Sequence, residues 1–172
     1  DYDFTRLHVP FMTIFLICQR AKKLDAITRE FLAGHPRGVV LQLGCGLDNR
    51  FWRVDNGTVS WYDLDMPPVV ELRRQFFTGS ERYHLIAASV TDRGWLATVV
   101  SGGRPVLVVA EGLLMYLSEA EVRRLVQQLH EAFPGCRLIA DVFSRFMARS
   151  ATRHPSLKRT AATIGWGVDD SR

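Results

Sequence analysis

The chain has few of the features that tie a protein to a membrane, a metal ion or an oxidising compartment. None of the apolar runs in its 172 residues is long enough to span a bilayer, and no signal-peptide cleavage site follows the short stretch from Phe11 to Cys18. There are only three cysteines, Cys18, Cys45 and Cys136, and their spacing is not that of metal ligands or of a disulfide framework. The sequence therefore predicts no membrane contact, no metal and a location in the reducing cytoplasm.

The positive charge is not concentrated either. A formal charge of +4 is spread along the chain, and only the segment from Arg153 to Arg159 gathers basic residues. A solvated loop explains this segment better than a binding patch, so we expect no nucleic-acid partner. The length and the content of 47% hydrophobic residues are those of one globular domain, residues 1–172. Because the chain starts at Asp1 instead of Met, we expect it to be a piece of a longer protein.

The most informative stretch is an apolar, β-branched run, Val39 to Leu43, that ends at Gly44-Cys45-Gly46. This is the pattern of a buried parallel strand that enters a tight turn. Glycine allows a ligand to approach the backbone, and in doubly wound sheets ligands bind outside the carboxyl end of the first strand. We predict that these three turn residues form the floor of a nucleotide-type pocket; a turn that needs glycine for its geometry alone is the alternative.

A second strand with carboxylates at its end, Ser60 to Asp65, follows the glycines by about 20 residues, the spacing of an acid that binds ribose hydroxyls. We assign this role to Asp65 and expect Asp63, on the opposite face of the strand, to matter less. The third glycine of a dinucleotide site is absent, since Leu47-Asp48-Asn49 follows the pair. A nucleoside without a pyrophosphate, such as S-adenosylmethionine, therefore suits the pattern better than NAD.

Strands and helices alternate along the rest of the chain. They are expected as a helix at Thr13–Ala33, a helix at Pro67–Phe76, strands at Tyr83–Ala87 and Pro105–Ala110, a helix after the Ser118/Glu121 capping box, a strand at Leu138–Phe143 and a hint of another at Ile164–Val168. The sequence thus predicts a three-layer α/β fold with a mostly parallel sheet and right-handed crossovers. The last strand exposes its outer edge, so we expect more chain, or a second copy in a homodimer, to cover it.

Three motifs occur in order along the chain. They are Leu43-Gly44-Cys45-Gly46-Leu47-Asp48 with Arg50-Phe51, then Trp61-Tyr62-Asp63-Leu64-Asp65-Met66-Pro67, then Ala110-Glu111-Gly112-Leu113-Leu114-Met115-Tyr116. Together they resemble the leucine carboxyl methyltransferase family, and more closely its bacterial branch of tetracenomycin-type polyketide O-methyltransferases. The resemblance extends from about residue 1 to residue 170. It implies a Rossmann-like class I methyltransferase fold, here without some terminal elements, and S-adenosyl-L-methionine as the cofactor.

Further residues are candidates for the site. Arg20 matches the family's arginine that holds the cofactor's carboxylate through a forked ion pair, with plain solvation as the alternative. Glu111 stands at the tip of the fourth strand beside the other strand tips, which favours a cofactor ligand over a helix cap. Ser89 and Val90, in the loop after the third strand, are expected to line the adenine. Tyr116 is a candidate contact to the methyl acceptor.

Gln42 stands two residues before the first glycine, where many methyltransferases have an acid. The sequence therefore does not identify the residue that contacts the cofactor's ammonium group.

We expect an S-adenosylmethionine-dependent O-methyltransferase that acts on a carboxylate or hydroxyl of a small molecule such as a polyketide-type metabolite. A carboxylate is ionised at neutral pH and needs no catalytic base, which fits the five scattered histidines. One alternative is a nicotinamide-dependent reductase, although no lysine follows Tyr116 at the fourth position. Another is a catalytically inactive binding domain of the same fold.

Overall fold

The protein is built on one five-stranded parallel sheet with the strand order β3-β2-β1-β4-β5. The computed structural model describes residues 10–151, 164 and 166–169. Its elements, in chain order, are α1 (Phe11–Gly34), β1 (Val39–Leu43), α2 (Arg50–Val54), β2 (Ser60–Asp65), α3 (Pro67–Arg73), β3 (Tyr83–Ala87), η2 (Gly94–Thr98), β4 (Val106–Ala110), η3 (Leu114–Tyr116), α4 (Glu119–Ala132), β5 (Arg137–Ala140) and α5 (Arg145–Ala151).

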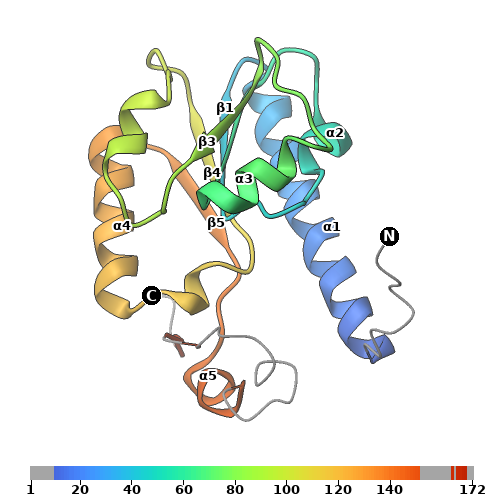
Figure 1. Ribbon diagram of the computed structural model, residues 1–172, viewed down its shortest axis with the longest axis vertical. Helices are drawn as coiled ribbons and strands as arrows, with labels where there is room; N and C mark the ends of the chain where they lie inside the picture. Colours follow the sequence, from blue (N-terminus) through green and yellow to red (C-terminus); the bar gives the residue numbers. More distant parts are fainter. Residues whose placement is uncertain (1–9, 152–163, 165, 170–172) are drawn as a thin grey trace.

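Helices cover both faces of the sheet, with α1 and α4 on opposite sides of the strands (Figure 1). Neighbouring residues of β1 point to opposite faces. Val40 therefore packs in a core with Phe31 of α1 and Phe51 of α2, whereas Leu41 packs in a core with Leu125 of α4. All five strand residues of β1 and of β4 are buried, which explains their continuous apolar sequences. The predicted three-layer α/β fold is confirmed.

The parallel register places four strand ends at one edge of the sheet. Leu43 of β1 pairs with Leu64 of β2 and with Ala110 of β4, and Ala110 pairs in turn with Ala140 of β5. Each of these four residues is followed directly by a residue of the candidate site. In the order of the strands across the sheet, these residues are Asp65, Gly44, Glu111 and Asp141.

The expected helix boundaries hold at α4 but not at α3. Ser118 caps α4 and forms the predicted capping box with Glu121, because each side chain bonds to the other residue's backbone N–H. Helix α3 was expected to reach Phe76 but ends at Arg73.

Among the residues that the structure describes, no helix has the length and the apolar character that a membrane span needs. The basic segment 153–159 lies outside the described residues.

Two expectations for the C-terminal part of the sheet were wrong. Strand β5 ends at Ala140 instead of Phe143, because the side chain of Asp141 turns to bond the backbone N–H of Gly112 and the chain leaves the sheet. Of the segment expected as a further strand, residues 164 and 166–168 are described and none of them is in a strand. Val168 donates a backbone hydrogen bond to Phe143 O at 2.8 Å.

Candidate functional site

The glycine turn after β1 has the backbone that its sequence predicts. Gly44 and Gly46 have φ angles of +63° and +49°, which other residues rarely adopt. A Cβ atom on Gly46 would meet nothing within 4 Å, whereas one on Gly44 would lie 3.0 Å from Leu113 Cδ1. Gly44 is thus required for packing as well as conformation, while Gly46 leaves its side of the turn open. Burial, aided by the charge of Asp63, raises the pKa of the Cys45 thiol far above its ordinary value, which favours the protonated thiol over the nucleophilic thiolate.

Asp65 lies at the tip of β2 and is joined to this turn. One carboxylate oxygen accepts the backbone N–H of Gly46 and the other accepts the N–H of Met66, both at 2.7 Å. The side chain is half-buried, so the carboxylate retains a face toward solvent. The position agrees with the expectation for a ribose-binding acid, and that role remains a prediction.

A buried arginine, Arg73 of α3, supports the turn from beneath. Its guanidinium donates to Gly46 O at 2.9 Å and to Asp48 O at 2.7 Å. It also donates to Asp63 Oδ2 at 2.5 Å and to the Tyr83 hydroxyl at 2.9 Å, and it has no solvent exposure. Arg73 was not among the residues predicted from the sequence, because an arginine on an amphipathic helix usually points to solvent.

The expectation that Asp63 and Asp65 lie on opposite faces of β2 was wrong. Residues two apart in a strand point to the same side. The two carboxylates differ in depth instead. Asp63 has no solvent exposure and accepts hydrogen bonds from Trp61 Nε1, Tyr83 OH and Arg73, so it is a structural group.

Arg20 of α1 joins the tips of β4 and β5. Its Nε donates to Glu111 Oε1 and its Nη1 donates to Asp141 Oδ2, both at 2.8 Å. The other oxygen of Asp141 accepts the backbone N–H of Gly112 at 2.6 Å. Arg20 therefore is not merely solvated, and its fork already holds two carboxylates. Asp141 was not among the predicted residues, although an acid directly after a strand was the signal that identified Asp65 and Glu111.

A second arginine, Arg50, lies behind Glu111 and is completely buried. Its Nε donates to Asp25 Oδ1 at 2.7 Å and its Nη2 donates to Glu111 Oε2 at 2.5 Å, while Nη1 lies 3.1 Å from Asp48 Oδ2. Burial by itself raises the pKa of Asp25, but the hydrogen bonds and charges of Arg53 and Arg50 outweigh burial and hold that pKa below its ordinary value.

Gln42 is also buried, and its Nε2 donates to Asp48 Oδ2 at 2.8 Å. Its Oε1 has no hydrogen-bond partner in the described part of the chain. The position that holds an acid in many methyltransferases is thus an amide here, and the neighbouring carboxylate comes from Asp48.

Several of these residues line a cavity of about 270 Å³ between α1 and the tips of β1 and β4. The residues that line it are Ile17, Arg20, Ala21, Gln42, Gly44, Cys45, Asp48 and Glu111. Four of the predicted site residues, Arg20, Gly44, Cys45 and Glu111, are therefore brought together. Asp65 adjoins them through its bond to Gly46.

The other predicted residues lie outside this cavity lining. Ser89 follows β3 and its hydroxyl lies 2.7 Å from the Thr91 hydroxyl, in a loop that the bond from Ala88 N to Asp65 O holds beside β2. Val90 is buried in the core on the α4 side of the sheet. Tyr116 in η3 is exposed. Contacts of these residues to adenine or to an acceptor remain predictions.

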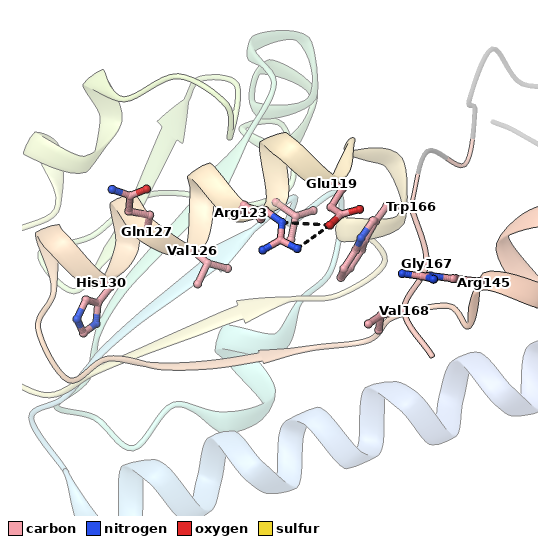
Figure 2. Close-up of a pocket in the computed structure, with 10 residues that line it drawn as sticks. Glu119, Arg123, Val126, Gln127, His130, Arg145, Trp166, Gly167 and Val168 are labelled. Atoms are coloured by element: carbon pink, nitrogen blue, oxygen red, sulfur yellow. Dashed lines mark hydrogen bonds and ion pairs between the residues drawn. The ribbon is translucent and has the colours of Figure 1, made fainter. Parts of the chain in front are cut away.

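A larger hollow of about 820 Å³ lies elsewhere, between α4 and the segment 166–168. Figure 2 shows Arg123, Gln127 and His130 of this helix on one side and Trp166 and Val168 on the other. None of the predicted site residues lines it. The strand tips, and not this hollow, are the candidate site.

Two solved methyltransferase structures have a similar fold. An O-methyltransferase family protein from Burkholderia thailandensis matches with a TM-score of 0.60 and 13% identity, over 88% of this chain and 47% of that chain. Magnesium protoporphyrin IX methyltransferase (ChlM) from Synechocystis PCC 6803 with bound SAH also matches with a TM-score of 0.60, at 12% identity, over 95% of this chain and 73% of that chain. At such low identity these matches show the fold alone.

Proteins related in sequence identify the family of the chain. The chain is 41% identical, over its whole length, to the tetracenomycin polyketide synthesis O-methyltransferase TcmP of Streptomyces glaucescens and spans 64% of that protein. It is 31% identical over 91% of its length to the S-adenosyl-L-methionine-dependent methyltransferase dpfgK of Gibberella zeae, of which it spans 57%. The leucine carboxyl methyltransferase family model matches residues 9–130. The chain therefore belongs to the leucine carboxyl methyltransferase family.

Proposed function

We propose that this chain carries the cofactor-binding part of an S-adenosyl-L-methionine-dependent O-methyltransferase. Its acceptor is a carboxylate or hydroxyl of a small molecule, of the polyketide type that the name of the Streptomyces relative mentions. The observation that supports this most is the row of Asp65, Gly44 and Glu111 across three adjacent strand tips, next to a cavity that Arg20 lines.

The residues at this edge fit the two ends of the cofactor. At the nucleoside end, Gly46 leaves open space over the turn and Asp65 offers a half-buried carboxylate for the ribose hydroxyls. At the amino-acid end, the positive charge of Arg20, whose Nε and Nη1 donate to Glu111 and Asp141, suits a carboxylate, and the negative charge of Glu111 suits an ammonium group. The cavity of about 270 Å³ adjoins this second end.

S-adenosylmethionine, when bound, supplies a methyl group whose carbon–sulfur bond breaks as the acceptor oxygen forms a carbon–oxygen bond in line with it. The chain's residues bind and orient the two reactants, and orientation of this kind accounts for a large part of the rate. A carboxylate acceptor has no proton to lose, whereas a hydroxyl must release one.

A methyl-transfer assay with labelled cofactor tests this function. The chain is incubated with a panel of aromatic carboxylic acids and phenols, and Asp65→Ala serves as the control for transfer that the site does not catalyse. We expect labelled ester or ether that depends on Asp65. S-adenosylhomocysteine binding without any transfer would instead indicate an inactive binding domain, and reduction of a substrate by a nicotinamide would indicate the reductase.

The partners proposed are a small-molecule acceptor and a second copy of the chain, in the cytoplasm and without nucleic acid. Within the described residues, β5 pairs with β4 alone, so one of its edges has free backbone groups. We expect the 172-residue chain to self-associate through this edge. Light-scattering chromatography checks this, and a sharp monomer peak over a wide concentration range would rule out the homodimer.

A further inference from the structure

Arg50 is the first residue of α2, and its side chain has no solvent exposure. It contacts carboxylates from three different segments: Asp25 in α1, Asp48 in the turn after β1 and Glu111 after β4. A buried arginine with partners on three segments fixes their relative positions, because each lost contact would leave a charge unpaired away from water.

Glu111 is held on both sides. Its Oε1 accepts from Arg20, whose side chain is 34% exposed, and its Oε2 accepts from the completely buried Arg50 at 2.5 Å. Arg20 lines the cavity and Arg50 does not. A ligand can therefore displace or rearrange Arg20, while Arg50 keeps its place behind the carboxylate.

We propose that Arg50 is the positioning residue that sets the orientation of Glu111 toward the amino-acid end of the cofactor. This inference rests on the proposed function, since it assumes that an amino acid occupies the cavity beside Glu111. Arg50 does not line the cavity and reaches it through Glu111 and through Asp48, a partner that it shares with Arg53. Its removal therefore weakens ligands that carry an amino-acid end and spares those that lack it.

Arg53 provides a matched control. It bonds Asp25 at 2.7 Å and Asp48 at 2.8 Å, two of the carboxylates that Arg50 contacts, but it has no contact to Glu111. Replacing Arg53 disturbs the same charged cluster and leaves the Arg50–Glu111 bond in place. A merely structural role of the cluster predicts similar effects of the two replacements.

The test compares Arg50→Lys with Arg53→Lys by calorimetry on two ligands, S-adenosylhomocysteine and 5′-methylthioadenosine. The second ligand has the nucleoside and the sulfur but no amino-acid end. We expect Arg50→Lys to weaken S-adenosylhomocysteine about tenfold or more, the loss of one charge-assisted hydrogen bond, with 5′-methylthioadenosine nearly unchanged. Arg53→Lys should leave the ratio of the two dissociation constants at its wild-type value.

The ratio also removes the effect of partial unfolding, because both ligands bind the same folded fraction and that fraction cancels. If Arg50→Lys gives no folded protein, Arg50→Gln, which keeps a donor, replaces it. Addition of Glu111→Gln to the Arg50 variant should then cause less loss than Glu111→Gln alone. Equal weakening of both ligands, or additive effects of the two substitutions, would overturn the inference. Failure of the wild-type chain to bind S-adenosylhomocysteine would instead reject the proposed function.

Discussion

Arg73 donates a hydrogen bond to the carbonyl oxygen of Gly46 over 2.9 Å, from a guanidinium with no solvent exposure. The N–H of the same glycine donates to Asp65 at 2.7 Å. Gly46 is thus held from the core through its carbonyl and from the strand tip through its amide. The turn is fixed before a ligand arrives, which reduces the ordering cost of binding.

Replacing Asp65 by alanine should weaken cofactor binding, whereas replacing Asp63 by alanine should lower the free energy of unfolding. Asp65→Ala removes an acceptor for the ribose hydroxyls and should cost roughly 2 to 4 kcal/mol of cofactor binding. Asp63→Ala breaks the buried pair with Arg73 and should cost roughly 3 to 5 kcal/mol of folding free energy. Urea unfolding and calorimetry measure the two quantities. If Asp65→Ala and Asp63→Ala both fold well and lose the same amount of cofactor binding, the assignment of Asp65 as the ribose-binding acid is contradicted.

Arg20→Lys keeps the positive charge but removes the guanidinium group, with its parallel N–H donors. We expect this variant to bind S-adenosylhomocysteine more weakly by about 1 to 2 kcal/mol, because lysine cannot offer two parallel donors. Binding of 5′-methylthioadenosine should scarcely change. Lys23→Arg, at an exposed position of the same helix, is the control. If both ligands weaken alike in Arg20→Lys, the arginine serves the structure through Glu111 and Asp141 and not the cofactor.

Gln42→Glu should be destabilising here, even though other methyltransferases have an acid at this position. The amide of Gln42 donates to Asp48 Oδ2, and its side chain is buried. A glutamate would replace this donor by a second carboxylate facing Asp48, at a cost on the order of 1 to 3 kcal/mol. Thermal unfolding measures the effect. Rescue is expected in the double variant Gln42→Glu with Asp48→Asn, and a Gln42→Glu protein as stable as wild type would contradict the account.

The pKa of Asp25 predicts a loss of stability in acid. Because this pKa is lower in the folded chain than its ordinary value of about 3.9, the carboxylate stabilises the fold above that value and loses the effect as the pH falls through the folded pKa. The free energy of unfolding of wild type should fall more steeply between about pH 5 and pH 3 than that of Asp25→Asn. Glu30→Gln, at an exposed position of the same helix, should keep the wild-type slope. Parallel curves for wild type and Asp25→Asn would contradict this.

The sheet and part of the site could be predicted because their signals are local. An apolar run such as Val39 to Leu43 must be buried on both faces, and a glycine pair or an acid at its end must lie at the sheet edge. Asp65 and Glu111 were found in this way. Asp141 carried the same signal and was missed because β5 was expected to continue past it.

The buried arginines could not be predicted from the sequence. Arg50 and Arg73 each have apolar neighbours in the sequence, Phe51 and Leu72, but an arginine side chain is ordinarily expected in solvent. Their burial depends on carboxylates more distant in the chain, Asp25 and Glu111 for Arg50 and Asp63 for Arg73. Such partners are identified only once the strands are in register.

The most direct test of the account is calorimetry on the 172-residue chain with S-adenosylhomocysteine and with NADH. The account predicts saturable binding of S-adenosylhomocysteine near one molecule per chain, weakened by Asp65→Ala, and no binding of NADH. The Rossmann-like fold alone would allow either ligand, so the comparison separates the two cofactor classes. Saturable NADH binding without S-adenosylhomocysteine binding, or binding that Asp65→Ala leaves unchanged, would contradict the proposed site.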